Sequence, residues 1–274
     1  MIADETLARM ARELTGVRGV VGVVLGGSRA RGDALPTSDV DLGVYYEGVP
    51  DTAELGRLAS RWSGREVAVG EPGSWGRWVD AGGWLDVEGT AIDWILRDVD
   101  RVAAQADRAN RGEFAFHPQA GHPLGFLDVS YAAELATGVV LADPAGRLAS
   151  VRAAVTAYPL ALRDVMVGAL WEADFLVGAA AKGARRADTT YVSLALARAV
   201  LLCAHALHAH AGRWVTNEKG LAPAVATLPD APADFSRDAA LALGALGATE
   251  ESLTAAVAAV ARLVGETRAS LGER

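Results

Sequence analysis

Two short apolar runs, separated by a polar segment rich in glycine and aspartate, dominate the first fifty residues. The first run is "VVGVVL" (20–25) and the second is "VDLGVYY" (40–46). Both are rich in β-branched residues and bounded by turn-forming residues, which is typical of buried strands. Whatever fold the chain adopts must therefore contain a sheet, and "GGSRARGDALPTSD" (26–39) must connect two of its strands.

The start of this connection has the properties of an anion-binding turn. Gly26 and Gly27 tolerate positive φ and leave room for backbone N–H groups to approach a ligand. N–H groups at such a turn, or at the start of a helix after it, hold anionic oxygens. Ser28 adds a hydroxyl, and Arg31 adds a positive charge about one helical turn further on. The segment is therefore a candidate phosphate-binding turn.

Three aspartates form a candidate metal site. Asp39 and Asp41 lie two apart at the start of the second strand, so both carboxylates share one face, where their repulsion is costly without a cation between them. In "AIDWI", Ala91, Asp93 and Ile95 are expected to share a strand face, which makes Asp93 the third carboxylate. Taken singly, a D-x-D pair is common, a G-G-S stretch can be a plain turn and Asp93 can be an edge-strand surface residue. Together they predict Mg²⁺ bound beside phosphates, as nucleoside triphosphate chemistry requires.

The stretch "GGSRARGDALPTSDVDL" (26–42) resembles the signature of the DNA polymerase β-like nucleotidyltransferase superfamily, especially its minimal and antibiotic-modifying branches. The resemblance implies a mixed sheet flanked by helices and two divalent metal ions. It also implies transfer of a nucleoside monophosphate from an NTP co-substrate, such as ATP, to a hydroxyl group, with release of pyrophosphate.

The resemblance further implies a role for each motif residue. Gly27 and Ser28 would contact the triphosphate, with Arg31 and Ser38 as helpers. Asp39 and Asp41 would hold the metal ions. Asp93 would be the third carboxylate, which ligates a metal or helps activate the acceptor.

The periodicity of apolar residues changes from strand-like to helical near residue 99. The sequence predicts helices at 4–14 and 51–62, a strand at 66–69, two or three strand pieces within 76–98, and long helices at 160–186, 190–211 and 249–272. We therefore predict an α+β protein. A nucleotidyltransferase domain with a mixed sheet and flanking helices would span residues 1–145, and a helical bundle that binds the acceptor would span residues 146–274.

The helical half supplies two further candidate residues. It resembles, less specifically, the C-terminal domain of bacterial nucleotidyltransferases of the kanamycin, streptomycin and lincosamide type, in "HPLGFLDVSYAAELATGVVLADP" and "GRWVTNEKG". Glu172 is a candidate general base, because the acceptor hydroxyl must lose a proton. Lys219 is a candidate phosphate ligand. The alternatives are a carboxylate on the solvated side of a helix and a surface lysine.

Two other functions stay open. Arg198 and His205 are seven residues apart, and this R-x6-H spacing resembles the motif of HEPN ribonucleases, although Ala199 stands where those nucleases prefer a polar residue. A HEPN-type RNA-cleaving C-terminal domain is one alternative. The other is a protein without catalytic activity that binds nucleotide as a sensor or acts as an antitoxin. The intact Asp39, Asp41 and Asp93 argue against a catalytically inactive site.

Composition and charge narrow the partners and the location. The net charge of −8 disfavours a surface that binds long nucleic acid, and favours a small, often cationic, acceptor of the aminoglycoside or lincosamide kind, or a protein. The single cysteine, Cys203, fits a reducing compartment. Arg198 and histidines interrupt the apolar stretch 191–212, which predicts a buried helix and no membrane partner. We expect a cytoplasmic protein, and the choice of NTP and homodimer formation stay open.

Overall fold

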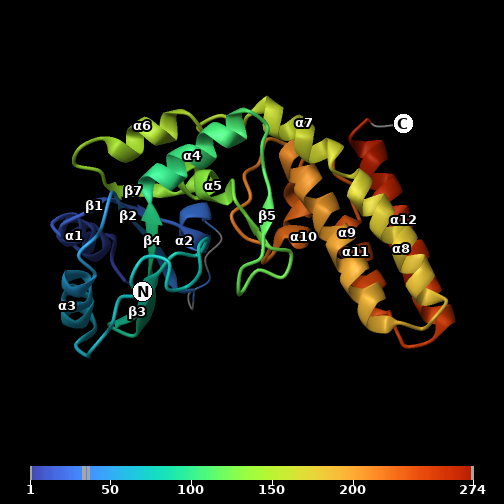
Figure 1. Cartoon of the computed structure of the whole chain (residues 1–274), viewed down its shortest axis with the longest axis horizontal. Coiled ribbons are helices and arrows are strands. Elements are labelled where there is room, and N and C mark those ends of the chain that lie inside the picture. Colours follow the sequence, from blue (N-terminus) through green and yellow to red (C-terminus); the bar gives the residue numbers. More distant parts are fainter. Residues whose placement is uncertain (1, 33–34, 36–37, 273–274) are drawn as a thin grey trace. The chain divides into compact units, whose positions relative to one another are not determined.

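The chain folds into two compact units in the computed structural model, which describes residues 2–32, 35 and 38–272. Motif residues 33–34 and 36–37 thus lie outside the described part. The first unit comprises Met1–Asn110 and Phe114–Ala157, and the second comprises Arg111–Glu113 and Tyr158–Arg274. Each is described by itself below. The predicted α+β class is confirmed, because the first unit contains a mixed sheet with helices and the second contains helices throughout its described elements (Figure 1).

The first unit alternates strands and helices. Its elements are α1 (Asp4–Thr15), β1 (Val20–Leu25), α2 (Gly27–Arg31), β2 (Val40–Tyr46), α3 (Thr52–Ser63), β3 (Gly82–Val87), β4 (Thr90–Asp98), α4 (Val99–Asn110), β5 (Phe116–His117), β6 (Phe126–Leu127), α5 (Ser130–Thr137), β7 (Val139–Ala142) and α6 (Arg147–Ala153). Five strands form one sheet in the order β3-β4-β2-β1-β7, while β5 and β6 pair separately. The pair β2–β4 is parallel and the other pairs are antiparallel, as the prediction of a mixed sheet required.

One face of the five-stranded sheet packs on α1 and α3. Alternate residues of the central strands lie in this core, where Leu42 of β2 and Trp94 of β4 are almost fully buried with Met10 of α1 and Leu55 of α3. The Trp94 indole N–H also donates to the sulfur of Met10 at 3.3 Å. Every second residue of β2 and β4 is therefore apolar because it packs in this core, and the residues between them point to the opposite face of the sheet.

Among the described residues of the first unit, the opposite face of the sheet is buried where β2 and β4 end. There Tyr45 and Arg97 are buried, and Arg97 forms a two-pronged ion pair with Glu134 of α5, with N···O distances of 2.6 and 2.8 Å. The Arg97 guanidinium also lies 5.1 Å from the ring centre of Tyr131. Towards the starts of the same strands, Asp41 and Asp93 are partly exposed. The uncovered part of the sheet face is therefore the part that carries the carboxylates.

The second unit is a helical bundle. Its elements are α7 (Leu160–Gly168), α8 (Trp171–Ala184), α9 (Thr189–His210), α10 (Leu221–Ala224), the 3₁₀ helix η1 (Val225–Thr227), α11 (Phe235–Gly244) and α12 (Glu250–Ser270). The central helix α9 is long and apolar enough to cross a membrane, but 72% of its apolar window is buried within the structure. Packing inside the protein thus accounts for its composition, as expected for a buried helix.

Two secondary-structure predictions are wrong. Residues 66–69 are not a strand: the Val67 N–H donates to Ser60 Oγ at 2.9 Å instead of to a neighbouring strand. A backbone hydrogen bond to the sheet is made at Gly70, whose N–H donates to the Gly82 carbonyl. The single helix predicted at 160–186 is two helices, α7 and α8. Their junction contains i to i−3 bonds, such as Leu170 N–H to the Val167 carbonyl, that tighten and end the first helix.

The boundary between the units lies at residues 157/158, whereas the sequence placed it at 145/146. Helix α6 causes the difference, because it belongs to the first unit. Leu148 of α6 is fully buried, and a Cβ on Gly22 of β1 would lie 2.5 Å from Leu148 Cδ1. The helical period of α6 is evident in the sequence, but the period does not specify the surface on which a helix packs.

Candidate active site

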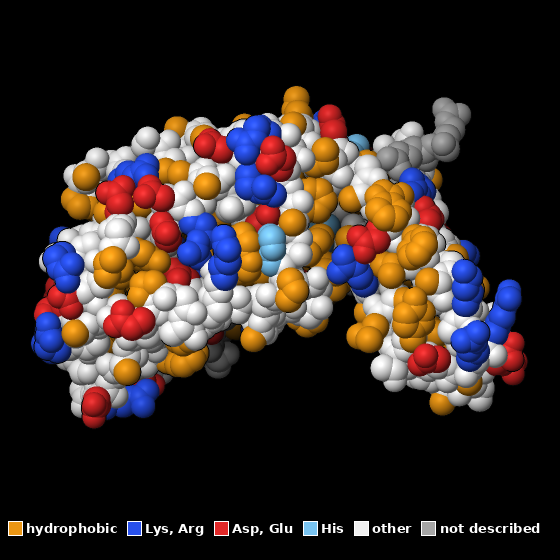
Figure 2. Space-filling view, viewed as in Figure 1, with side chains coloured by type: hydrophobic (Ala, Val, Ile, Leu, Met, Phe, Trp, Pro, Cys, Tyr) orange, Lys and Arg blue, Asp and Glu red, His pale blue; other side chains and the backbone are white. Residues whose placement is uncertain are grey.

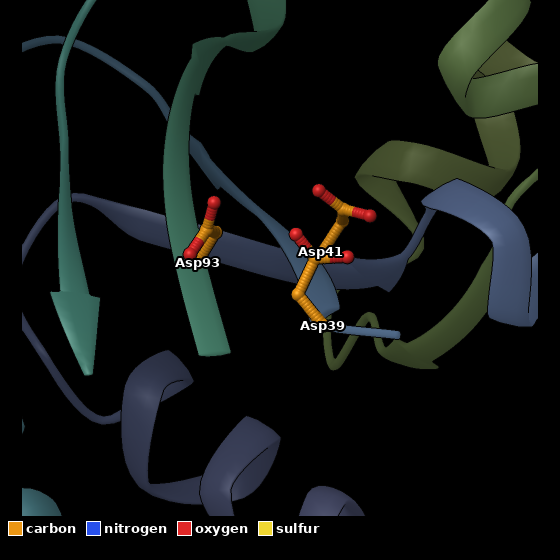
Figure 3. A group of neighbouring side chains, drawn as sticks. All are labelled: Asp39, Asp41 and Asp93. Carbon is orange, nitrogen blue, oxygen red and sulfur yellow. The ribbon is translucent and has the colours of Figure 1, made fainter. Parts of the chain in front are cut away.

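The carboxylates of Asp39, Asp41 and Asp93 converge at the starts of two parallel strands. Asp41 and Asp93 are direct partners in the β2–β4 register, and Asp39 precedes β2 by one residue. One oxygen of each residue lies within 4.8 Å of the other two (Figure 3). Asp39 is exposed, while Asp41 and Asp93 are half-buried. The period of two in each strand and the parallel register together produce the cluster that the sequence predicted.

This cluster has the donor set of a divalent cation site. Three like charges at such separations repel one another, and a cation between them removes that cost. Carboxylate oxygens are the ligands that Mg²⁺ prefers, and Mg²⁺ commonly takes its remaining ligands from water and substrate phosphates. The residues present therefore fit a metal ion.

The glycine turn at Gly26 and Gly27 lies directly against the Asp41 carboxylate. The Gly26 N–H donates to the Asp41 carbonyl at 2.8 Å, so the end of β1 is tied to the start of β2. Gly27, with φ of +62°, then begins α2. A Cβ on Gly27 would lie 1.8 Å from Asp41 Oδ2. Glycine is thus required here for two reasons: the backbone conformation and the space taken by the Asp41 carboxylate.

The sequence analysis missed Arg29, which braces the loop that carries Asp39. Its Nε donates to the Asp39 carbonyl at 3.1 Å, and its Nη2 donates to the Ser38 carbonyl at 2.8 Å. Asp39 itself lies outside β2, so the strand ladder does not fix its backbone. The sequence shows that Arg29 follows Ser28, the predicted phosphate ligand, but it does not reveal that Arg29 bonds back to the backbone before β2.

Three further residues predicted for the phosphate site, Ser28, Arg31 and Ser38, lie in or near this turn. Ser28 and Arg31 belong to α2, where Ser28 is half-buried and Arg31 is exposed. The Ser38 hydroxyl accepts a hydrogen bond from the Leu35 N–H at 2.9 Å, and the Ser38 N–H donates to the Leu35 carbonyl. Ser38 therefore shapes the turn before Asp39, and its role towards a nucleotide stays a prediction.

The remaining predicted site residues, Glu172 and Lys219, belong to the second unit. Glu172 Oε1 accepts a hydrogen bond from Arg198 Nε at 2.6 Å, and both side chains are about one-third exposed. Lys219 is exposed in the turn before α10, and its backbone N–H donates to Asn217 Oδ1. Their proposed roles as general base and phosphate ligand stay predictions.

The proposed ribonuclease pair does not resemble an accessible catalytic site. His205 is 4% exposed within the bundle, and burial, together with the nearby His208, lowers its pKa to about 3. Arg198, seven residues away, is paired with Glu172. A neutral histidine in the core is poorly placed to exchange protons with RNA.

The mixed sheet, with a glycine turn beside converging carboxylates, is the arrangement that the resemblance to DNA polymerase β-like nucleotidyltransferases implies. Residues 5–78 match the family model described as a nucleotidyltransferase domain, a range that includes Gly27, Ser28, Asp39 and Asp41. Residues 5–78 of the N-terminal unit are therefore assigned to a nucleotidyltransferase domain, which supports transfer of a nucleoside monophosphate as the general activity.

A nucleotidyltransferase-like protein from Exiguobacterium sibiricum is similar in structure, with a TM-score of 0.44 and 13% sequence identity over 97% of this chain and 77% of that chain. The search of curated proteins found no match.

Proposed function

We propose that this protein transfers a nucleoside monophosphate from an NTP to a hydroxyl group of a small molecule or a protein, and that the transfer depends on Mg²⁺. The observation that carries the proposal is the convergence of Asp39, Asp41 and Asp93 within 4.8 Å beside the turn at Gly27. Strand register creates this cluster at the uncovered part of the sheet face, although its mutual repulsion opposes folding in the absence of a cation.

The three carboxylates would hold Mg²⁺, two ions by the family resemblance, and bound Mg²⁺ would neutralise charge on the phosphates and on the departing pyrophosphate. The backbone at Gly27 and the Ser28 hydroxyl would bind triphosphate oxygens, with Arg31 as a nearby positive charge. Arg29 keeps Asp39 in place through its two bonds to the loop backbone.

The bond changes follow from the reaction class. The acceptor oxygen forms a bond to the α-phosphorus, and the bond from that phosphorus to the bridging oxygen breaks, so pyrophosphate leaves with the electron pair. The hydroxyl proton passes to a carboxylate base. Asp93, which belongs to the cluster, is the candidate base here, and the role of Glu172 stays a prediction from the sequence.

The acidity of the chain supports a small or protein acceptor over a long polynucleotide. The net charge is −8, and Figure 2 shows acidic and basic side chains interspersed over the face in view. Binding a polynucleotide through many phosphates depends on a basic surface. A small cationic acceptor would instead be attracted by the negative field of the protein. A protein with this composition fits the cytoplasm.

The experiment incubates purified protein with each α-labelled NTP, Mg²⁺ and a panel of hydroxyl acceptors that includes aminoglycosides, lincosamides and proteins. We expect a labelled product and the release of unlabelled pyrophosphate. EDTA, Asp39→Asn and Asp41→Asn should each abolish both. Asp86→Asn is the matched control, because Asp86 is an exposed carboxylate on β3 outside the cluster, and Asn can still accept the bond from the Gly89 N–H.

Transfer that persists in both cluster variants would refute the proposed site. Mg²⁺-dependent NTP binding without transfer to any acceptor would favour the sensor or antitoxin alternative. RNA cleavage that persists in EDTA and is lost in His205→Ala would favour the ribonuclease alternative, because HEPN-type cleavage needs no metal.

A further inference from the structure

Trp84 is an exposed aromatic side chain in the same row as the metal-site carboxylates. It is 63% exposed, and in the antiparallel β3–β4 register it lies directly opposite Asp93. Directly opposite residues point to the same face of a sheet, with Cβ atoms about 4.5–5.5 Å apart. Across the sheet the row therefore reads Trp84, Asp93 and Asp41, and it ends at the Gly26 turn.

A second tryptophan supports Trp84 from one side. The rings of Trp75 and Trp84 are stacked, with centroids 4.4 Å apart and an interplanar angle of 17°. Glycine at position 82 is needed here, because a Cβ there would lie 2.0 Å from the Trp94 carbonyl oxygen and 2.9 Å from the Trp75 ring. The two indoles thus form a defined aromatic surface beside the carboxylates, which we call the tryptophan pair.

The loop that carries Trp75 is tied down by the buried residue Asp80. Asp80 has φ of +74° and no exposed surface. Its carboxylate accepts hydrogen bonds of 2.8 Å from the Tyr46 hydroxyl and from the Gly73 N–H. The Trp75 N–H donates to the Asp80 carbonyl, and Gln119 Nε2 donates to the Trp75 carbonyl at 2.8 Å. A ligand that met the tryptophan pair would therefore meet a surface that is already ordered.

A single exposed tryptophan is common on protein surfaces and by itself indicates nothing. Two features separate Trp84 from that case. The β3–β4 register places Trp84 beside Asp93. Its ring also stacks on Trp75, whose loop is held by hydrogen bonds. An ordered aromatic face next to a reaction centre is a typical means of orienting a substrate ring.

We propose that the tryptophan pair binds the acceptor, by stacking Trp84 on a ring that carries or adjoins the reacting hydroxyl. This proposal rests on the proposed function. In phosphoryl transfer the attacking and leaving oxygens lie roughly in line on opposite sides of the phosphorus. The phosphate-binding turn lies on the β1 side of the carboxylates and Trp84 lies on the β3 side. Pyrophosphate leaving towards the turn thus requires the acceptor to enter from the side of Trp84.

The chemistry of the pair specifies the kind of acceptor. A flat indole face suits the apolar C–H face of a sugar or an aromatic ring, and an amino group on that ring would gain a cation–π contact. The neighbouring carboxylates would attract the same amino group. The acceptor is therefore a hydroxylated ring compound, with an amino-substituted sugar as the favoured case. The base of the NTP is the rival occupant, which the test must distinguish.

The experiment compares Trp84→Ala and Trp84→Phe with the full-length wild type in saturation-transfer NMR. The probes are methyl α-D-glucopyranoside, kanamycin and lincomycin as ring acceptors, and ATP with Mg²⁺ as the nucleotide. Trp171→Ala is the matched control, since Trp171 is 64% exposed and lies in the second unit. Circular dichroism and a thermal melt confirm that each variant is folded.

We expect at least one ring acceptor to contact the wild type, to lose that contact in Trp84→Ala and to retain it in Trp84→Phe and Trp171→Ala. If the compound is also a substrate, its KM should rise at least about fivefold in Trp84→Ala, while the KM of the NTP changes less than about twofold. A Trp84→Ala protein that loses ATP contact instead, or a panel in which no acceptor contact depends on Trp84, overturns the proposal. The NMR measurement needs no turnover, so a wild type that binds a ring through Trp84 but releases no pyrophosphate would refute the proposed function instead.

Discussion

Gly27→Ala tests whether the Asp41 carboxylate needs the space that the missing side chain of Gly27 leaves. The new Cβ would lie 1.8 Å from Asp41 Oδ2 and 2.8 Å from its Cγ, so the carboxylate must retreat by about 1 Å or more to reach an ordinary contact. Alanine at φ of +62° also costs about 1–2 kcal/mol of folding free energy, because the left-handed conformation brings Cβ close to the carbonyl oxygen. Misplacing a catalytic group by 1 Å lowers the rate by about 100-fold.

We therefore expect Gly27→Ala to lose about 1–2 kcal/mol of unfolding free energy from the backbone alone, and about 100-fold or more in nucleotide transfer. Gly32→Ala separates the two effects. Gly32 also has a left-handed backbone, with φ of +79°, but no atom of the described residues lies within 4 Å of its Cβ position. Gly32→Ala should therefore lose a similar amount of unfolding free energy but keep most of its transfer activity.

Urea denaturation followed by circular dichroism measures the stability of each variant, and pyrophosphate release at saturating Mg²⁺ measures the rate. The reasoning predicts similar losses of stability from the shared backbone cost, and a loss of rate confined to Gly27→Ala. Equal rates in the two variants would show that the Asp41 carboxylate does not need the space beside Gly27.

Three further predictions concern single residues. Arg29→Ala removes two hydrogen bonds to the loop that carries Asp39. The Mg²⁺ concentration for half-maximal transfer should therefore rise about tenfold, which corresponds to a loss of about 1.4 kcal/mol in binding free energy. An unchanged Mg²⁺ titration would contradict the bracing role. Ser28→Ala should lower kcat/KM for the NTP by about tenfold to a hundredfold, the value of one hydrogen bond to a charged group, and an unaltered value would place the triphosphate elsewhere. His205 has a folded-state pKa of about 3, below its unfolded value of about 6.5. The unfolded state therefore binds a proton more readily, and the free energy of unfolding should fall by about 1.4 kcal/mol per pH unit as the pH drops from 6.5 towards 3. The urea midpoint of the wild type should fall accordingly between pH 7 and pH 4.5, the fall should be smaller in His205→Gln, and an equal fall in both would exclude His205 as its source.

The sequence was sufficient for those parts of the site that local periodicity determines. The strand at 20–25, the strand at 40–46 and the shared face of Asp39 and Asp41 follow from runs of apolar residues and the period of two. Asp93 could be assigned because its apolar neighbours alternate in the same way. Each inference uses residues that are close in the chain, where the backbone geometry is fixed by the element type.

Features that depend on pairing between distant segments could not be predicted in this way. The position of Trp84 opposite Asp93 depends on the register of β3 against β4, which the apolar pattern alone does not specify. The incorrect strand at 66–69 has the same origin, since nothing local showed that Ser60 would accept the bond from the Val67 N–H. The role of Arg29 required the path of the loop before β2.

The cluster of three carboxylates also affects how this protein responds to selection. In a chelating buffer the like charges of these side chains repel one another without a cation between them, so replacing Asp39 or Asp41 with asparagine should raise thermal stability while it destroys the proposed site. A library screened for heat resistance without divalent cations would therefore enrich inactive variants. The same library screened with Mg²⁺ and an NTP would reverse that preference, because ligands that bind only the folded state stabilise the variants that still bind them.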